Sequence, residues 1–160
     1  MKTKEFIKRL EAEFNGILKP LGYSKRGKRW VCETAQCFCL VSLQQSQWGE
    51  QFYVNLGAFV KQLGPRTDAP QEHQCHYRIR LARLLPDKTA LERCLDLENE
   101  VAEDERLKTI GTALRDYGVA WLKSAESLEG IRVRLTEGTE EGAAVTVSLK
   151  NLLGLELRHD

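Results

Sequence analysis

The clearest strand in the sequence is QFYVNLGAFV, residues 51–60. Successive side chains of a β-strand point to opposite faces of a sheet, so alternate positions share a face. One face of this strand is wholly apolar, and it consists of Phe52, Val54, Leu56, Ala58 and Val60. The other face carries Tyr53 and Asn55 among its members. The segment therefore predicts a strand with one face on a hydrophobic core and one face that is partly polar.

Three neighbouring segments also have strand character, at residues 30–33, 37–45 and 76–82. The second half of 37–45 alternates Val41 and Leu43 with the polar residues Ser42, Gln44 and Ser46. The segment 76–82 alternates Tyr77, Ile79 and Leu81 with His76, Arg78 and Arg80. Because the segments follow one another along the chain, they predict a four-stranded antiparallel meander.

Helical patterns flank these strands on both sides. Residues 3–19 place apolar side chains three and four positions apart, and Pro20 and Gly22 end the pattern. After residue 86, similar spacing predicts a short helix near 91–95, a long one over about 98–123, and a third that Ser127 caps. The tail, 143–153, fits a helix or a strand, and we favour a helix. The whole chain, 1–160, is expected to form one α+β domain, in which an N-terminal helix and the four-stranded meander precede a C-terminal set of helices packed on one sheet face.

Composition indicates an ordinary globular protein. No apolar run approaches the roughly 18 residues that a membrane span needs, and the first residues lack a secretory signal. Five cysteines, three of them within eight residues, are expected to be reduced, which predicts a cytoplasmic protein. Residues 1–83 hold 14 basic and 7 acidic side chains, whereas residues 84–160 hold 10 and 16. The two halves either neutralise each other on folding or leave a basic face for an acidic partner.

The polar face of the predicted sheet is the best candidate site. In a meander it gathers seven polar side chains, with Ser42 beside them: Gln44, Ser46, Tyr53, Asn55, His76, Arg78 and Arg80. One interpretation is an ordinary solvated outer face. The other is a binding surface, because the planar fork of arginine fits carboxylate and phosphate groups. We therefore predict a non-enzymatic binding or accessory protein whose partner is an acidic protein surface or a small anionic ligand.

Two other functions remain open. The basic turn Lys25, Arg26, Lys28 and Arg29 lies between Tyr23 and Trp30, which could stack on bases of a nucleic acid, although surface turns are often charged for solubility alone. A hydrolase or nuclease could instead use His76 as general base or acid, with Arg78 and Arg80 stabilising negative charge. The sequence contains no Gly-x-Ser-x-Gly nucleophile elbow that would support the hydrolase hypothesis, and we expect catalysis to be absent.

Metal and cofactor sites are not expected. His73, Cys75 and His76 lie close in sequence, as do Cys37 and Cys39, but their spacing differs from that of structural zinc sites. Strand alternation also sends Cys75 and His76 to opposite faces, which argues against a cysteine–histidine nucleophile.

Three ordered segments resemble a known family. They are ILKPLGYSKRGKRW at 17–30, LQQSQWGEQFYVNLG at 43–57 and CHYRIRL at 75–81. Together they are similar to the hallmark segments of the bacterial domain of unknown function 4304 (DUF4304) family. The resemblance covers the first half of the chain and carries over no catalytic positions. It implies an accessory or immunity-type binding protein.

Overall fold

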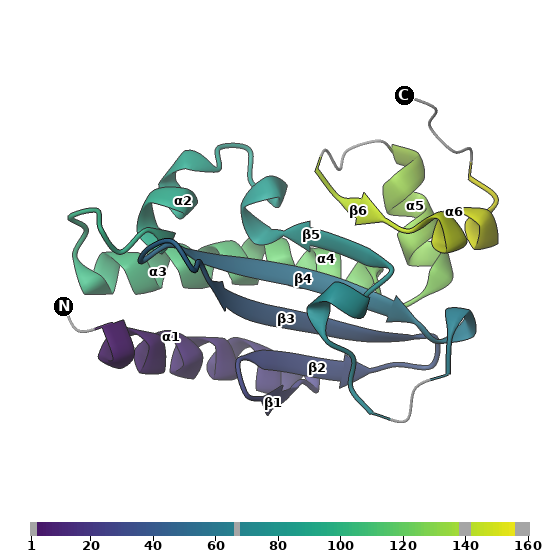
Figure 1. The fold of residues 1–160 in the computed structure, drawn as a ribbon, viewed down its shortest axis with the longest axis horizontal. Coiled ribbons are helices and arrows are strands. Elements are labelled where there is room, and N and C mark those ends of the chain that lie inside the picture. The colour runs from purple at the N-terminus through teal and green to yellow at the C-terminus, as the bar shows by residue number, and fades with distance from the viewer. Residues whose placement is uncertain (1–2, 66–67, 138–141, 156–160) are drawn as a thin grey trace.

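The computed structural model describes residues 3–65, 68–137 and 142–155. Its centre is an antiparallel sheet in which each strand pairs with the next along the chain (Figure 1). Six strands form the sheet: β1 Ser24–Arg26, β2 Arg29–Glu33, β3 Cys37–Gln45, β4 Phe52–Val60, β5 Tyr77–Arg80 and β6 Ala144–Val145. The α+β class and the antiparallel meander are confirmed.

The predicted number of strands, four, was wrong. The first additional strand, β1, lies in the basic turn and pairs with β2 through Lys25 opposite Trp30. All three of its residues are exposed, so it has no apolar face that a pattern could reveal. The second, β6, has two residues and pairs with β5 through Val145 opposite Tyr77. It lies in the tail, 143–153, for which both a strand and a helix were considered. The tail in fact forms the short strand β6 first and then the helix α6, Val147–Leu153.

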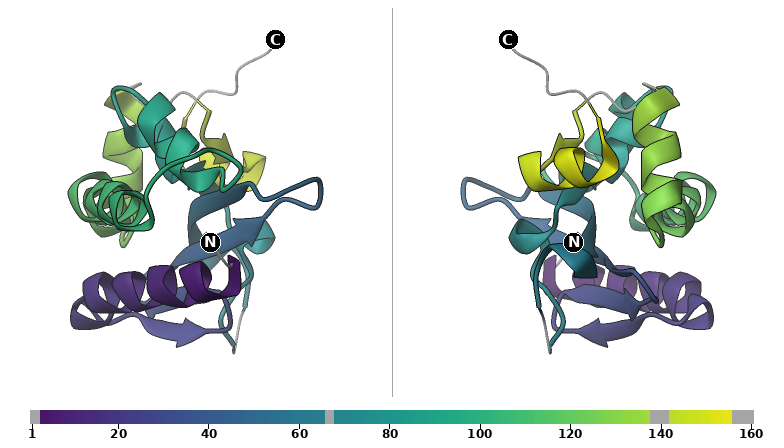
Figure 2. Two further views of the ribbon diagram at one scale, coloured as in Figure 1. Left: turned by 90° about the vertical axis from the view of Figure 1, so that its left-hand side faces the viewer. Right: turned by 90° about the vertical axis from the view of Figure 1, so that its right-hand side faces the viewer.

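Helices α1, α3 and α4 lie on one side of the sheet (Figures 1 and 2). The helices are α1 Thr3–Leu18, α2 Thr89–Leu95, α3 Glu103–Ala113, α4 Val119–Ser124, α5 Leu128–Glu137 and α6 Val147–Leu153. A single long helix was expected over 98–123, but it begins later and a π-helical turn, η5 (Leu114–Gly118), separates α3 from α4. Ser127 caps α5 as expected, because its Oγ accepts a hydrogen bond of 3.0 Å from the Gly130 N–H.

The main hydrophobic core fills the space between the sheet and these helices. Leu10 and Phe14 of α1, Trp30 and Leu56 of the sheet, and Trp121 of α4 are completely buried there. The Trp30 Nε1–H donates a hydrogen bond of 2.8 Å to Asn15 Oδ1, which satisfies the buried indole. One complete face of the sheet is therefore committed to packing.

The opposite sheet face is divided into a covered half and an open half. A small apolar cluster, Val31, Phe38, Leu40, Phe59 and Cys75, packs under Ala69 of the β4–β5 connection. That connection includes the short 3-10 helix η3, Glu72–Gln74, which lies in front of the sheet in Figure 1. Gly57 permits this cover, since a Cβ at that position would lie 2.9 Å from Cys75 Sγ. The open half holds most of the polar residues that the sequence analysis singled out.

None of the helices among the described residues is long and apolar enough to cross a membrane.

Candidate functional site

Strand pairing arranges the polar residues of the open half in rows. Arg29 lies opposite Ser42, Ser42 opposite Asn55, and Asn55 opposite Arg80, so four strands contribute to one row. Arg78 belongs to the next row, where it lies opposite Gly57. The space above Gly57 itself is filled by Cys75. The alternation predicted from the sequence therefore places the two arginines and Asn55 on the same face.

Asn55, Arg78 and Arg80 line a depression of about 440 Å³. Its polar lining consists of Gln44, Asn55, Glu72, Arg78, Arg80 and Arg83. The floor is well ordered, because Asn55 is only 5% exposed and its Nδ2 donates a hydrogen bond of 2.8 Å to Gln44 Oε1. This bond leaves the Gln44 amide N–H groups available to a bound acceptor.

The described residues that line the depression include three guanidinium groups and one carboxylate. Arg78 Nη1 lies 3.7 Å from Glu72 Oε1, which offsets part of its charge. The Arg80 guanidinium lies 3.9 Å from the centre of the Tyr53 ring, a cation–π contact that holds it in place. Arg83 packs on the backbone of Gly142. Among the described residues, neither Arg80 nor Arg83 has an ion pair, so the depression is suited to an anion.

A second, smaller cavity adjoins the depression. Its volume is about 210 Å³, and it shares Arg80 and Arg83 with the larger one. Gln51 and Tyr53 of the β3–β4 region and Glu92 of α2 also line it. The two arginines thus form the boundary between the cavities. A bound group could contact both guanidinium groups from either side.

Three predicted site residues lie outside the depression: Tyr53 lines only the smaller cavity, and His76 and Ser46 line neither. The His76 ring packs 4.5 Å from the Phe59 ring, and its Nδ1 accepts a hydrogen bond of 3.0 Å from the Val60 N–H. Ser46 belongs to the β3–β4 turn, where its Oγ accepts a hydrogen bond of 3.2 Å from the Trp48 N–H. Both side chains hold backbone in place, and neither is among the residues that line the cavities.

Arg83 and Glu72 were missed in the sequence. Strand character was expected to continue through residue 82, but the chain turns after Arg80 into a 3-10 helix, η4 (Leu81–Leu84). Residues three apart lie on the same side of such a turn, which brings Arg83 next to Arg80. Glu72 reaches the site because η3 folds back over the sheet. Neither turn has a periodic pattern that could reveal it.

We expect His76 to make stability depend on pH. Burial lowers the pKa of His76 below its ordinary value of 6.5, so the unfolded chain takes up a proton at a higher pH than the folded chain. This contribution to stability is complete above the unfolded pKa and is lost progressively as the pH falls from that value through the lower pKa of the folded chain. Urea unfolding at about pH 7.5 and about pH 5.5 should show a larger loss for the wild type than for His76→Gln. An equal loss in both proteins would contradict this origin.

The aromatic residues beside the basic turn are buried, so they cannot stack on the bases of a nucleic acid. Trp30 is completely buried and Tyr23 is 5% exposed. Lys25 Nζ donates a hydrogen bond of 2.6 Å to the Gly27 carbonyl oxygen and lies 3.8 Å from Glu11. Arg29 Nη2 donates to the Ala69 carbonyl oxygen at 3.4 Å. The turn therefore offers positive charge without a flat surface for bases.

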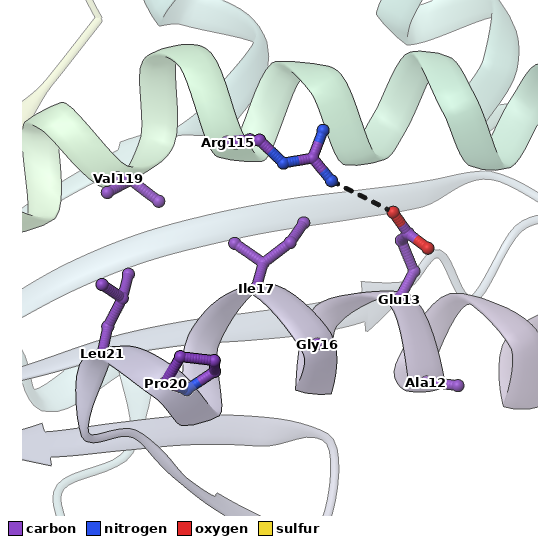
Figure 3. Close-up of a pocket in the computed structure, with 8 residues that line it drawn as sticks. All are labelled: Ala12, Glu13, Gly16, Ile17, Pro20, Leu21, Arg115 and Val119. Atoms are coloured by element: carbon purple, nitrogen blue, oxygen red, sulfur yellow. Dashed lines mark hydrogen bonds and ion pairs between the residues drawn. The ribbon is translucent and has the colours of Figure 1, made fainter.

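Figure 3 shows a third hollow, a groove of about 500 Å³ between α1 and the η5–α4 segment. Its walls are largely aliphatic, with Ile17, Leu21 and Val119 pointing into the space between the helices. The two charged residues neutralise each other, because Arg115 Nη2 lies 3.4 Å from Glu13 Oε1. This groove has no unbalanced charge with which to select an ion.

Two of the buried thiols, Cys37 and Cys39, are poorly suited to act as nucleophiles. Burial raises the pKa of Cys37 to about 11, and it raises the pKa of Cys39 well above its ordinary value. Both side chains are therefore protonated near neutral pH, whereas the thiolate is the reactive form. In the part of the chain that the structure describes, no group of three His, Cys, Asp or Glu side chains is arranged to hold a metal ion.

Comparison with known proteins gives one match. A family model described as "Domain of unknown function (DUF4304)" matches residues 14–124. No curated protein and no solved structure matches the chain. The matched region contains every strand from β1 to β5 and all the polar residues that line the depression.

Proposed function

Since the chain belongs to the DUF4304 family, whose description assigns no activity, we propose its function from the site alone: it is a non-enzymatic binding protein that holds an anionic group in the arginine-lined depression. The observation that carries the proposal is the convergence of Arg78, Arg80 and Arg83 around Asn55 and Gln44. Among the described residues of the lining, Glu72 is the one carboxylate that accompanies them.

The geometry favours recognition of carboxylate or phosphate oxygens. A guanidinium group presents its N–H donors in a planar fork, which can bind two oxygens of one anion at once. The contact with Tyr53 fixes the Arg80 plane before binding, so less side-chain entropy is lost when an anion arrives. The Gln44 amide supplies further donors from the floor of the depression.

The same geometry supports binding rather than hydrolysis. A general base must reach the proton that it removes, at hydrogen-bond distance or through one water. His76 is the histidine closest in sequence to the arginines, and its Nδ1 is already engaged by the Val60 N–H. The Glu72 carboxylate is engaged as well, since its Oε1 lies 3.7 Å from Arg78 Nη1.

We expect the double variant Arg78→Ala, Arg80→Ala to lose at least about tenfold in affinity for small anions, because hydrogen bonds to charged groups contribute about 1.5–3 kcal/mol each. Suitable probes are inorganic phosphate, pyrophosphate, citrate and a short polyglutamate peptide. Titration calorimetry at low and at physiological ionic strength would measure the affinities, and binding should weaken as salt increases.

Arg115→Ala is the matched control for this experiment. It removes one positive charge, against two in the double variant, from the helical side of the molecule, where Arg115 pairs with Glu13. Its affinity for the probes should equal that of the wild type. The proposal is rejected if the wild type binds none of the four probes, or if the double variant, shown to be folded by circular dichroism, binds them unchanged.

A further inference from the structure

Trp48 is the most exposed large hydrophobic side chain among the described residues. It is 89% exposed, whereas Trp30 and Trp121 are completely buried. An indole has a large apolar area, and keeping that area in water is unfavourable. Tryptophan is also the residue type most enriched among the energetic centres of protein interfaces. Nothing in the folding of the chain requires an indole at this position.

The turn that carries Trp48 is anchored at its base. The Ser46 N–H donates a hydrogen bond of 2.8 Å to the Gln51 carbonyl oxygen, which closes the hairpin. The Leu97 N–H donates to the Glu50 carbonyl oxygen at 3.1 Å, and Thr3 Oγ1 donates to Glu50 Oε2 at 2.6 Å. The turn is thus tied to the α2–α3 connection and to the start of α1. Because the backbone beneath Trp48 is already held, little backbone entropy is lost when a partner binds.

The turn extends from the sheet on the side opposite α1 and α3 (Figure 2). This is the side of the open sheet face and of η3. The smaller cavity connects the two regions, since Gln51 and Tyr53 line it together with Arg80 and Arg83. At about 3.3 Å per residue, the turn begins about 16 Å from the row that contains Asn55 and Arg80. One interface of standard size, about 800 Å² per partner, covers both.

The surroundings of this surface indicate the class of partner. Glu72 and Glu92 line the two cavities, and Glu50 and Glu98 flank the turn, where a Cβ on Gly49 would lie 3.5 Å from Glu98 Oε1. A nucleic acid presents a phosphate at every nucleotide and would meet these carboxylates repeatedly. A protein surface can place acidic side chains against the arginines and donors against the carboxylates.

We propose that Trp48 and the arginine-lined depression form one docking surface for a protein partner. The partner presents an acidic patch to Arg78, Arg80 and Arg83, and beside it an apolar pocket that receives the Trp48 indole. This inference rests on the proposed function, because the acidic patch occupies the same depression. It adds the second contact and selects a protein over a free small anion.

The test begins with peptides selected from a random phage-displayed library on the wild-type chain. We expect the enriched peptides to combine acidic and apolar residues. Binding of the synthesised peptides is then followed through tryptophan fluorescence and its quenching by iodide, because Trp48 is exposed and the other two tryptophans are buried. Binding should shield Trp48 from iodide. The variant Trp48→Ala should lose about tenfold or more in affinity, measured by calorimetry.

Two further variants complete the design. Leu21→Ala removes another exposed apolar side chain, in the groove of Figure 3, and should bind like the wild type. Arg80→Ala should weaken binding to a similar extent as Trp48→Ala. If Arg80→Ala lost peptide affinity and Trp48→Ala did not, the docking surface would be overturned and the proposed function would stand. Loss in Trp48→Ala alone would overturn both. A library without enrichment, or binding of an oligothymidylate that depends on Trp48, would overturn the protein partner.

Discussion

Replacing Arg106 by alanine is expected to lower the free energy of unfolding by about 3–5 kcal/mol. Arg106 is completely buried in α3. Its Nη1 donates hydrogen bonds to the carbonyl oxygens of Cys94, at 2.8 Å, and Asp96, at 3.0 Å, and its Nη2 donates to that of Asn99. Alanine would leave these three acceptors without a donor and would open a cavity at the end of α2. Urea unfolding followed by circular dichroism measures the loss.

Arg93→Ala is the control for Arg106. Arg93 lies in the same region of the chain but is exposed, and its hydrogen bond to the Glu100 carbonyl oxygen is long, at 3.5 Å. Its replacement should change stability by less than about 0.5 kcal/mol. Arg106→Lys should fall between the two, because one ammonium group cannot reproduce the fork that spans the three carbonyls. Equal effects at 93 and 106 would show that the buried contacts contribute little.

Replacing Gly130 by alanine is expected to destabilise the fold by about 3 kcal/mol. A Cβ at this position would overlap the Ser124 carbonyl oxygen, and backbone cannot rotate away as a side chain can. The first turn of α5 would have to shift. Ile131, the next residue, is completely buried in the main core and would shift with it. Thermal unfolding of the purified variant measures the effect.

Gly16→Ala serves as the comparison for Gly130, with the opposite expected sign. Gly16 is inside α1, and a Cβ there would have nothing within 4 Å. Alanine is favoured over glycine in a helix by about 1 kcal/mol, so this variant should be more stable than the wild type. If both substitutions had the same sign, the close approach at Gly130 would not be the cause.

The parts of the fold that bury a periodic apolar face were predictable. The strand over 51–60 and the helix over 3–19 appear as β4 and α1 with boundaries shifted by one residue at most. The strand β1 was not predictable, because Ser24, Lys25 and Arg26 all lie exposed and form a strand only through pairing with β2. The π-helical turn η5 was also missed, since it changes the hydrogen-bond pattern and leaves the helical spacing nearly intact.

For the candidate site, the sequence predicted which face of the sheet each side chain occupies, but it did not predict where strand β5 ends. Alternation alone places Asn55, Arg78 and Arg80 on one face, and that follows from strand geometry. Arg83 joins them only because β5 ends at Arg80 and the chain turns. His76 has the expected alternation, but its ring contacts Phe59 and its Nδ1 accepts the Val60 N–H, interactions that no single-strand pattern encodes.

The two outermost strands limit how this molecule can associate. One edge of the sheet is β1, three residues long with two cationic side chains, and the other is β6, two residues long. Short, charged edges give an incoming chain few unpaired N–H and C=O groups to recruit, so adding a strand to either border would contribute little. Association through strand addition is therefore disfavoured at both edges, and so is growth into a continuous ribbon of copies.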